Sequence, residues 1–132
     1  MLKLSKKIEY SLIALKSIKD SMDGELLSAK EISEQNNLSY DLLAKVLQNL
    51  VRKKILISTQ GTKGGYTFAK NPSEVSVFSI ISIFENNIGI TNCLKNDEPF
   101  CYNSENCCIK NPMTKVQNDI YRYFKSVTIN QL

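Results

Sequence analysis

The chain has 132 residues and a mass of 15.0 kDa, which allows one domain with a small appendage and excludes a multi-domain enzyme. Hydrophobic residues make up 42% of it and charged residues 23%, so a packed core is expected. Histidine is absent, which excludes Ser-His-Asp triads, HExxH zinc sites and Cys2His2 fingers. Any bound metal must be held by Cys, Asp or Glu.

The positive charge is concentrated in the N-terminal half. Residues 1–70 carry 12 basic against 7 acidic residues, whereas residues 71–132 carry 5 against 6. A polyanionic partner and a solvated basic face would both account for this asymmetry. The N-terminus has no continuous hydrophobic segment, and the longest apolar stretch, 77–84, is far below the roughly 20 residues that cross a bilayer. We therefore expect a cytoplasmic protein without a membrane partner.

Three helices are predicted in the first fifty residues. Apolar residues recur at helical spacing between Ser5 and Met22. Ser28 and Glu31 form a capping box that opens a short second helix, which ends at Asn36-Asn37. A third helix follows Ser39, which can cap it, and its apolar residues form one buried stripe.

The other face of the third helix is polar. It carries Asp41, Lys45, Gln48 and Arg52 at positions i, i+4, i+7 and i+11, so these side chains lie in one line. Two short helices with such a line on the second are typical of a helix-turn-helix. Taken alone, the line is also typical of an ordinary solvent-exposed face.

A β-hairpin is predicted directly after the third helix. Residues 55–60 and 66–69 have strand character, and the glycine-rich segment 61–65 between them carries Lys63. Glycine allows a close approach to a phosphate, although it also simply makes the turn. A helix-turn-helix followed by such a wing favours nucleic-acid binding.

The C-terminal half is predicted to contain two helices separated by a loop. The first runs from about Glu74 to Glu85 and should pack on the first helix. The second opens with Asn111 as N-cap and Pro112 at the first helical position. Its apolar stripe comprises Met113, Val116, Ile120, Tyr123 or Phe124, and Val127. We expect this stripe to pair with the same helix of a second copy in a symmetric dimer, and packing within the chain is the alternative.

All four cysteines lie in the loop, within a 16-residue window: Cys93, Cys101, Cys107 and Cys108. In a reducing compartment, clustered cysteines indicate metal or redox chemistry more often than disulfides. The pattern C-x7-C-x5-C-C lacks the C-x2-C knuckles of zinc ribbons, so structural zinc is disfavoured. A thiol switch formed by the two adjacent cysteines is an alternative, although a disulfide between neighbouring residues is strained.

These residues resemble the Rrf2 type of bacterial winged-helix repressors, which includes the IscR and NsrR regulators. The resemblance covers nearly the whole chain. It rests on LSKKIEYSLIAL, AKEISEQNNLSYDLLAKVLQNLVRKKIL, the wing QGTKGGY, the cysteine loop and the closing VTINQL. It implies a mainly α protein with a small β-hairpin wing: a winged helix-turn-helix domain at 1–85, a cluster-binding cysteine loop at 86–110, and a dimerisation helix and tail at 111–132.

The resemblance also implies an iron-sulfur cluster held by Cys93, Cys101 and Cys107. The first gap is seven residues rather than the expected five, and Cys108 beside Cys107 makes the third ligand ambiguous. IscR-like members use a histidine after the third cysteine, which is missing here. NsrR-like members use a carboxylate near the start of the first helix of the other subunit, where Glu9 lies. Glu9, or else Cys108, is then the fourth ligand, and a four-iron cluster is favoured over a two-iron one.

The resulting prediction is a homodimeric repressor that binds a palindromic DNA operator and senses nitric oxide, redox state or iron supply through the cluster. A clusterless regulator with thiol or small-ligand sensing and a small electron-transfer protein are the alternatives. Gln60 stands where IscR-like members carry arginine, which weakens the case for minor-groove contact there. The predicted DNA-binding residues are Ser39, Tyr40, Asp41, Lys45, Gln48, Arg52, Gln60 and Lys63.

Overall fold

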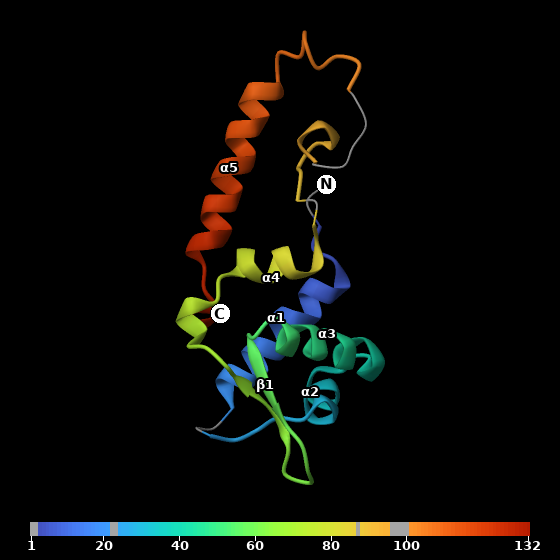
Figure 1. Ribbon diagram of the computed structural model, residues 1–132, viewed down its shortest axis with the longest axis vertical. Helices are drawn as coiled ribbons and strands as arrows, with labels where there is room; N and C mark the ends of the chain where they lie inside the picture. The colour runs from blue at the N-terminus through green and yellow to red at the C-terminus, as the bar shows by residue number, and fades with distance from the viewer. Residues whose placement is uncertain (1–2, 22–23, 87, 96–100) are drawn as a thin grey trace.

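The computed structural model describes residues 3–21, 24–86, 88–95 and 101–132 and shows a helical head from which one long helix extends (Figure 1). The α-helices are α1 (Lys6–Asp20), α2 (Ala29–Asn36), α3 (Tyr40–Arg52), α4 (Val77–Phe84) and α5 (Lys110–Ser126). The strands are β1 (Leu56–Thr59) and β2 (Gly65–Phe68), and the 3-10 helices are η1 (Pro72–Glu74), η2 (Asn92–Leu94) and η3 (Ile129–Gln131). In the described ranges, no helix is both long and apolar enough to span a membrane.

The head is built from α1, α2 and α3, whose apolar faces meet in one core. The Ser28–Glu31 capping box is confirmed, because the backbone N–H of each residue donates to the side chain of the other. Asn37 ends α2 in the left-handed conformation at φ 52°. The largest fully buried side chains of this core include Leu15, Ile32, Leu43, Leu47 and Leu50. The helix-turn-helix prediction is therefore confirmed.

The hairpin lies against the linker between α1 and α2. Its strands are antiparallel, with Leu56 opposite Phe68 and Thr59 opposite Gly65. The N–H of Tyr66 also donates to the carbonyl oxygen of Leu27 at 2.8 Å, which ties β2 to the linker. A β-carbon on Gly65 would lie 2.6 Å from the Leu27 backbone, so this close approach requires glycine.

The helix expected from Glu74 to Glu85 begins later than predicted. Residues 72–74 form the separate turn η1, and α4 starts at Val77 after the N-cap Ser76. The intervening residues pair instead with the end of the chain: Val77 N–H donates to Val127 O at 2.9 Å, and Ile129 N–H donates to Val75 O at 2.8 Å. This pairing requires extended backbone, which a sequence window around Glu74 does not reveal. The predicted packing of α4 on α1 is confirmed.

The long helix α5 begins at Lys110, so the prediction of Asn111 as its N-cap is wrong. Ile109 occupies the N-cap position, with no side-chain hydrogen bond to the helix. Pro112 still falls in the first turn, where its missing N–H costs no helical hydrogen bond. The apolar stripe divides: Phe124 and Val127 pack on the head, whereas Val116 and Tyr123 are 43% and 66% exposed.

Candidate DNA-binding surface and cysteine loop

The polar line on α3 is exposed as predicted. Asp41, Lys45, Gln48 and Arg52 all lie at the surface, opposite the buried stripe of the same helix. This separation arises because the helix is strongly amphipathic and its apolar side faces α1 and α2. The line is therefore accessible to a partner along its whole length.

A lysine from α1 joins this line. Lys7 borders the same shallow groove of about 240 Å³ as Lys45, Gln48 and Arg52. Within the described residues, Lys7, Lys45 and Arg52 form no ion pair with an acidic side chain. Three uncompensated cations around one groove favour a polyanionic partner. Lys7 was not predicted, because it lies 38 positions before Lys45 in the sequence and only packing of α1 on α3 brings them together.

The start of α3 is held by α1 rather than by its own cap. Ser39 occupies the N-cap position, but its side chain makes no capping hydrogen bond, which corrects the predicted cap. Its backbone N–H donates instead to the Tyr10 hydroxyl oxygen at 3.2 Å. Tyr40 is 54% exposed at the same end of the helix. Burial raises the pKa of the Tyr66 phenol, with a smaller contribution from Tyr40.

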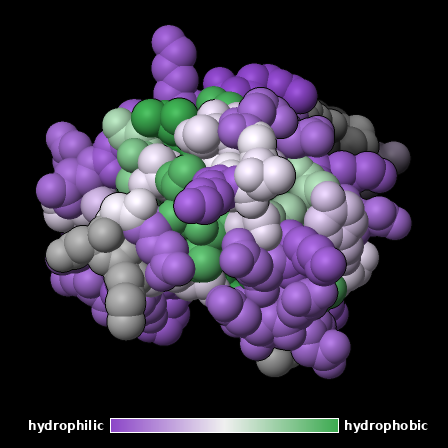
Figure 2. All heavy atoms as spheres, turned by 90° about the horizontal axis from the view of Figure 1, so that it is seen from below, coloured by the Kyte–Doolittle hydropathy of each residue, from purple (hydrophilic) through white to green (hydrophobic). Residues whose placement is uncertain are grey.

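The wing tip is exposed and polar. Gln60 and Lys63 are both accessible, and Gly64 N–H donates to Gly61 O at 3.0 Å to close the turn. Gly61 has φ +118°, a conformation that favours glycine. Figure 2 looks onto the end of the molecule that carries the wing and α2, and most side chains on this face are hydrophilic.

The four cysteines are free thiols. Cys93 and Cys108 are exposed, whereas Cys101 and Cys107 are half-buried in a run of turns. Cys93 lies in η2, with its sulfur 3.3 Å from the Thr91 hydroxyl. Clustered thiols are the donor type that iron-sulfur clusters use, so the donor chemistry fits such a group. Across the described ranges, however, no three cysteine or acidic side chains come together as a metal site.

Glu9 lies in the first turn of α1, and its carboxylate forms an ion pair with Lys6 at 2.7 Å. The hydrogen bond with Glu9 raises the pKa of the Lys6 ammonium above its ordinary value. The Glu9 side chain is 38% exposed, so a group outside this chain can reach it. The described part of the chain does not bring Glu9 together with two cysteines.

Comparison with known proteins agrees with this geometry. The family described as "Rrf2: Iron-dependent Transcriptional regulator" matches residues 4–132. The regulator NsrR of Oceanobacillus iheyensis is 27% identical over 129 residues, which cover 98% of this chain and 88% of that protein. The structure of T. potens IscR is similar with a TM-score of 0.76 and 25% identity, covering 98% of this chain and 85% of the other.

A further structure shows the fold alone. CymR, described as the global cysteine regulator of B. subtilis, has a TM-score of 0.79 at 23% identity and covers 99% of this chain and 95% of its own. These relatives are regulators rather than enzymes. The match over almost the full length therefore agrees with a DNA-binding winged helix-turn-helix head and excludes the reading as a small electron-transfer protein.

Proposed function

Since the chain belongs to the Rrf2 family of transcriptional regulators, we propose that it is a homodimeric repressor whose affinity for operator DNA depends on an iron-sulfur cluster. The observation that carries the proposal is the exposed line on α3, where Lys45 and Arg52 share a groove with Lys7 of α1 and none of the three forms an ion pair with a described residue. The same chain carries four free cysteines within 16 residues. DNA binding needs the first feature, and signal sensing needs the second.

The α3 line would enter the major groove. Lys45 and Arg52 would contact phosphates or guanine edges, and Gln48 can pair with adenine through its amide. Ser39, Tyr40 and Asp41 lie at the N-terminal end of α3, where recognition helices meet the bases. Lys63 of the wing, with Gln60 beside it, would reach the adjacent backbone, and Lys7 extends the phosphate contacts to α1. Two-fold symmetry then predicts two half-sites separated by whole turns of about 34 Å.

The cluster would be held by Cys93, Cys101 and Cys107, with Glu9 from a second copy of the chain or Cys108 as the fourth ligand. When bound, such a cluster supplies an iron centre that reacts with nitric oxide or oxygen and responds to iron supply. The chain itself connects this loop to α5: Ile90 N–H donates to Gln117 Oε1 at 3.1 Å, and the Tyr121 hydroxyl donates to Ile88 O. A change around Cys93 therefore acts directly on the helix proposed to pair the subunits.

A clusterless thiol sensor is the second candidate. It is favoured by the adjacent free cysteines Cys107 and Cys108, of which Cys108 is exposed. Accessible thiols can be oxidised reversibly and could bias the same loop without any cluster. The two candidates make opposite predictions for iron and sulfide content.

The test is purification without oxygen, followed by visible absorption, circular dichroism, and iron and sulfide analysis. A brown protein with matching iron and sulfide supports the cluster, and Cys93→Ala should lose it and change operator affinity. Cys108→Ala is the matched comparison: retained absorbance makes Cys107 the third ligand and leaves Glu9 as the fourth. A colourless protein that cannot be reconstituted rejects the cluster and favours thiol sensing. Unchanged absorbance in Cys93→Ala would refute the ligand set.

A further inference from the structure

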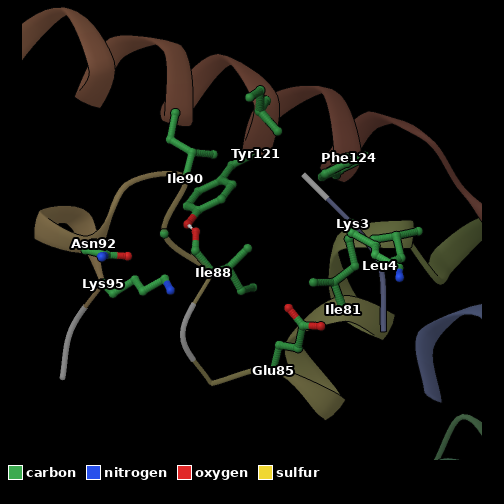
Figure 3. Close-up of a pocket in the computed structure, with 12 residues that line it drawn as sticks. Lys3, Leu4, Ile81, Glu85, Ile88, Ile90, Asn92, Lys95, Tyr121 and Phe124 are labelled. Atoms are coloured by element: carbon green, nitrogen blue, oxygen red, sulfur yellow. Dashed lines mark hydrogen bonds between the residues drawn. The ribbon is translucent and has the colours of Figure 1, made fainter. Parts of the chain in front are cut away.

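A cavity of about 330 Å³ lies between the end of α4, the middle of α5 and the segment 88–95 (Figure 3). We propose that it is a binding site for a small zwitterion with an apolar body, namely an α-amino acid with a branched or aromatic side chain. Its volume is at the lower end of the range of about 300–1,000 Å³ that ligand sites occupy. The proposed DNA-binding and cluster functions do not use the space inside this cavity, although its wall segment 88–95 carries Cys93.

The walls of the cavity are fixed by specific contacts. The Tyr121 hydroxyl donates to Ile88 O, and Gln117 accepts the N–H of Ile90, so the segment is attached to α5 at two points. Burial raises the pKa of the Tyr121 phenol, which keeps its proton available for this bond. A β-carbon on Gly89 would lie 2.7 Å from the backbone nitrogen of Lys95, so glycine lets the segment fold back on itself. The site is therefore preformed, which lowers the ordering cost of binding.

The lining combines an apolar body with charges of both signs: the carboxylate of Glu85 and the ammonium groups of Lys95 and of the exposed Lys3. Ile81, only 2% exposed, lies with Ile120 and Phe124 on the apolar side. Glu85 and Lys95 are both half-buried, and neither forms an ion pair with a described residue. Figure 3 shows Lys95 reaching towards Ile88 from one side and Glu85 rising from the end of α4 on the other.

A ligand that carries both charges completes this site. Partly buried charges are stabilised by opposite charges that are hydrogen-bonded to them. The Lys95 ammonium matches a carboxylate, and the Glu85 carboxylate matches an ammonium group. The apolar side chain of the ligand would then lie on Ile81, Ile120 and Phe124. A simple carboxylate would leave Glu85 unpaired, and a simple amine would leave the lysines of the lining unpaired.

Isothermal titration calorimetry on the full-length protein, cluster-free and as isolated without oxygen, tests this with L-leucine as the probe. The comparison ligands are 4-methylpentanoate, which lacks the ammonium group, and isoamylamine, which lacks the carboxylate. L-leucine should bind at least tenfold more tightly than either. In Lys95→Gln, L-leucine should no longer bind more tightly than isoamylamine. In Glu85→Gln, L-leucine should no longer bind more tightly than 4-methylpentanoate.

Lys115→Gln, an exposed lysine of α5 away from the cavity, is the matched control and should bind L-leucine as the wild type does. Failure of the wild-type protein to bind L-leucine in either form, or equal affinity for all three compounds, would overturn the proposal. The wild-type ligand series decides the question even if a variant does not fold. Operator binding measured without amino acids tests the proposed regulator separately, so the two proposals can fail independently.

Discussion

Lys45 and Leu47 are two positions apart on α3 and lie in opposite environments. Leu47 is fully buried, whereas Lys45 is exposed in the groove shared with Lys7. The helical period alone separates these side chains, so their roles could be read from the sequence. The contribution of Lys7 could not, because it depends on how α1 crosses α3.

Replacing Lys45 with alanine should weaken operator binding by on the order of 1 kcal/mol, because one phosphate or base contact is lost. The salt dependence of the affinity should fall by about one counterion if the contact is to phosphate. Fluorescence anisotropy with an operator duplex at several salt concentrations measures both. Lys115→Ala removes the same charge from α5 and should leave the affinity for the operator unchanged. Equal operator affinity of the two variants would show that the polar line on α3 is an ordinary solvent-exposed face.

Replacing Tyr10 with phenylalanine should weaken operator binding while leaving the fold intact. The ring remains packed, but the Ser39 N–H loses its acceptor, a bond with a net value of about 0.5–1.5 kcal/mol. Anisotropy measures the affinity, and chemical unfolding measures the stability. Ser82→Ala, which removes an exposed hydroxyl on α4 that donates to Phe78 O of the same helix, is the control. A large loss of stability without a selective loss of operator binding would make Tyr10 purely structural.

At the level of elements, the ends of helices were predicted well only where the cap is local. The Ser28–Glu31 box lies within four residues and is present as predicted. The starts of α4 and α5 were misplaced, because Val75 and Val77 pair with residues about fifty positions away and Ile109 starts α5 without a capping side chain. The N-cap of α3 was predicted only in part: Ser39 occupies the N-cap position, but its backbone N–H donates to the Tyr10 hydroxyl and its side chain does not cap the helix.

The capping box should make part of the stability depend on pH. Hydrogen bonds from Ser28 hold the pKa of the Glu31 carboxyl below its ordinary value of 4.5. The folded state thus binds this proton less tightly than the unfolded state, so the stabilisation is complete above about pH 4.5 and is lost as the pH falls through the lower folded pKa. Glu31→Gln should melt below the wild type at pH 7, and the difference should shrink towards pH 3.

Thermal unfolding followed by circular dichroism between pH 7 and pH 3 measures this effect. Glu34→Gln on the same helix is the control, because Glu34 lies in the last turn and should not stabilise the helix there. A wild-type advantage that stays constant over this pH range would show that the Glu31 charge does not contribute.

At the level of the whole molecule, the C-terminal end of α5 and the residues that follow it pack on the head. Ile129, which is fully buried, returns to the head, and Phe124 and Val127 pack on Ile8 and Ile81. Of the other apolar stripe residues of α5, Met113 and Ile120 are half-buried, whereas Val116 and Tyr123 stay exposed. A helix that is attached to the head at its C-terminal end and to segment 88–95 at its middle, but leaves Val116 and Tyr123 exposed, suits pairing with a second copy.

Val116→Glu should therefore dissociate the proposed dimer, because a charge would be buried in the helix pair. Ile57→Glu is a matched control: Ile57 is 50% exposed, but it lies on β1 in the wing. Sedimentation equilibrium of both variants and the wild type gives the oligomeric state. A wild-type monomer, or a dimer unaffected by Val116→Glu, would refute α5 as the dimer interface.

The sequence alone determined the features that depend on local period and spacing: the helical head, the exposed line on α3, the hairpin wing and the four clustered thiols. Each follows from residues a few positions apart, where helix and strand periods fix which side chains share a face. Tertiary structure alone decided the groove that Lys7 and Lys45 share, the bond from Ser39 to Tyr10, the extended pairing of residues 75–77 with 127–129, and the cavity beside α5. These features join residues that are distant in the sequence, and such contacts depend on how whole elements pack rather than on any pattern within one element.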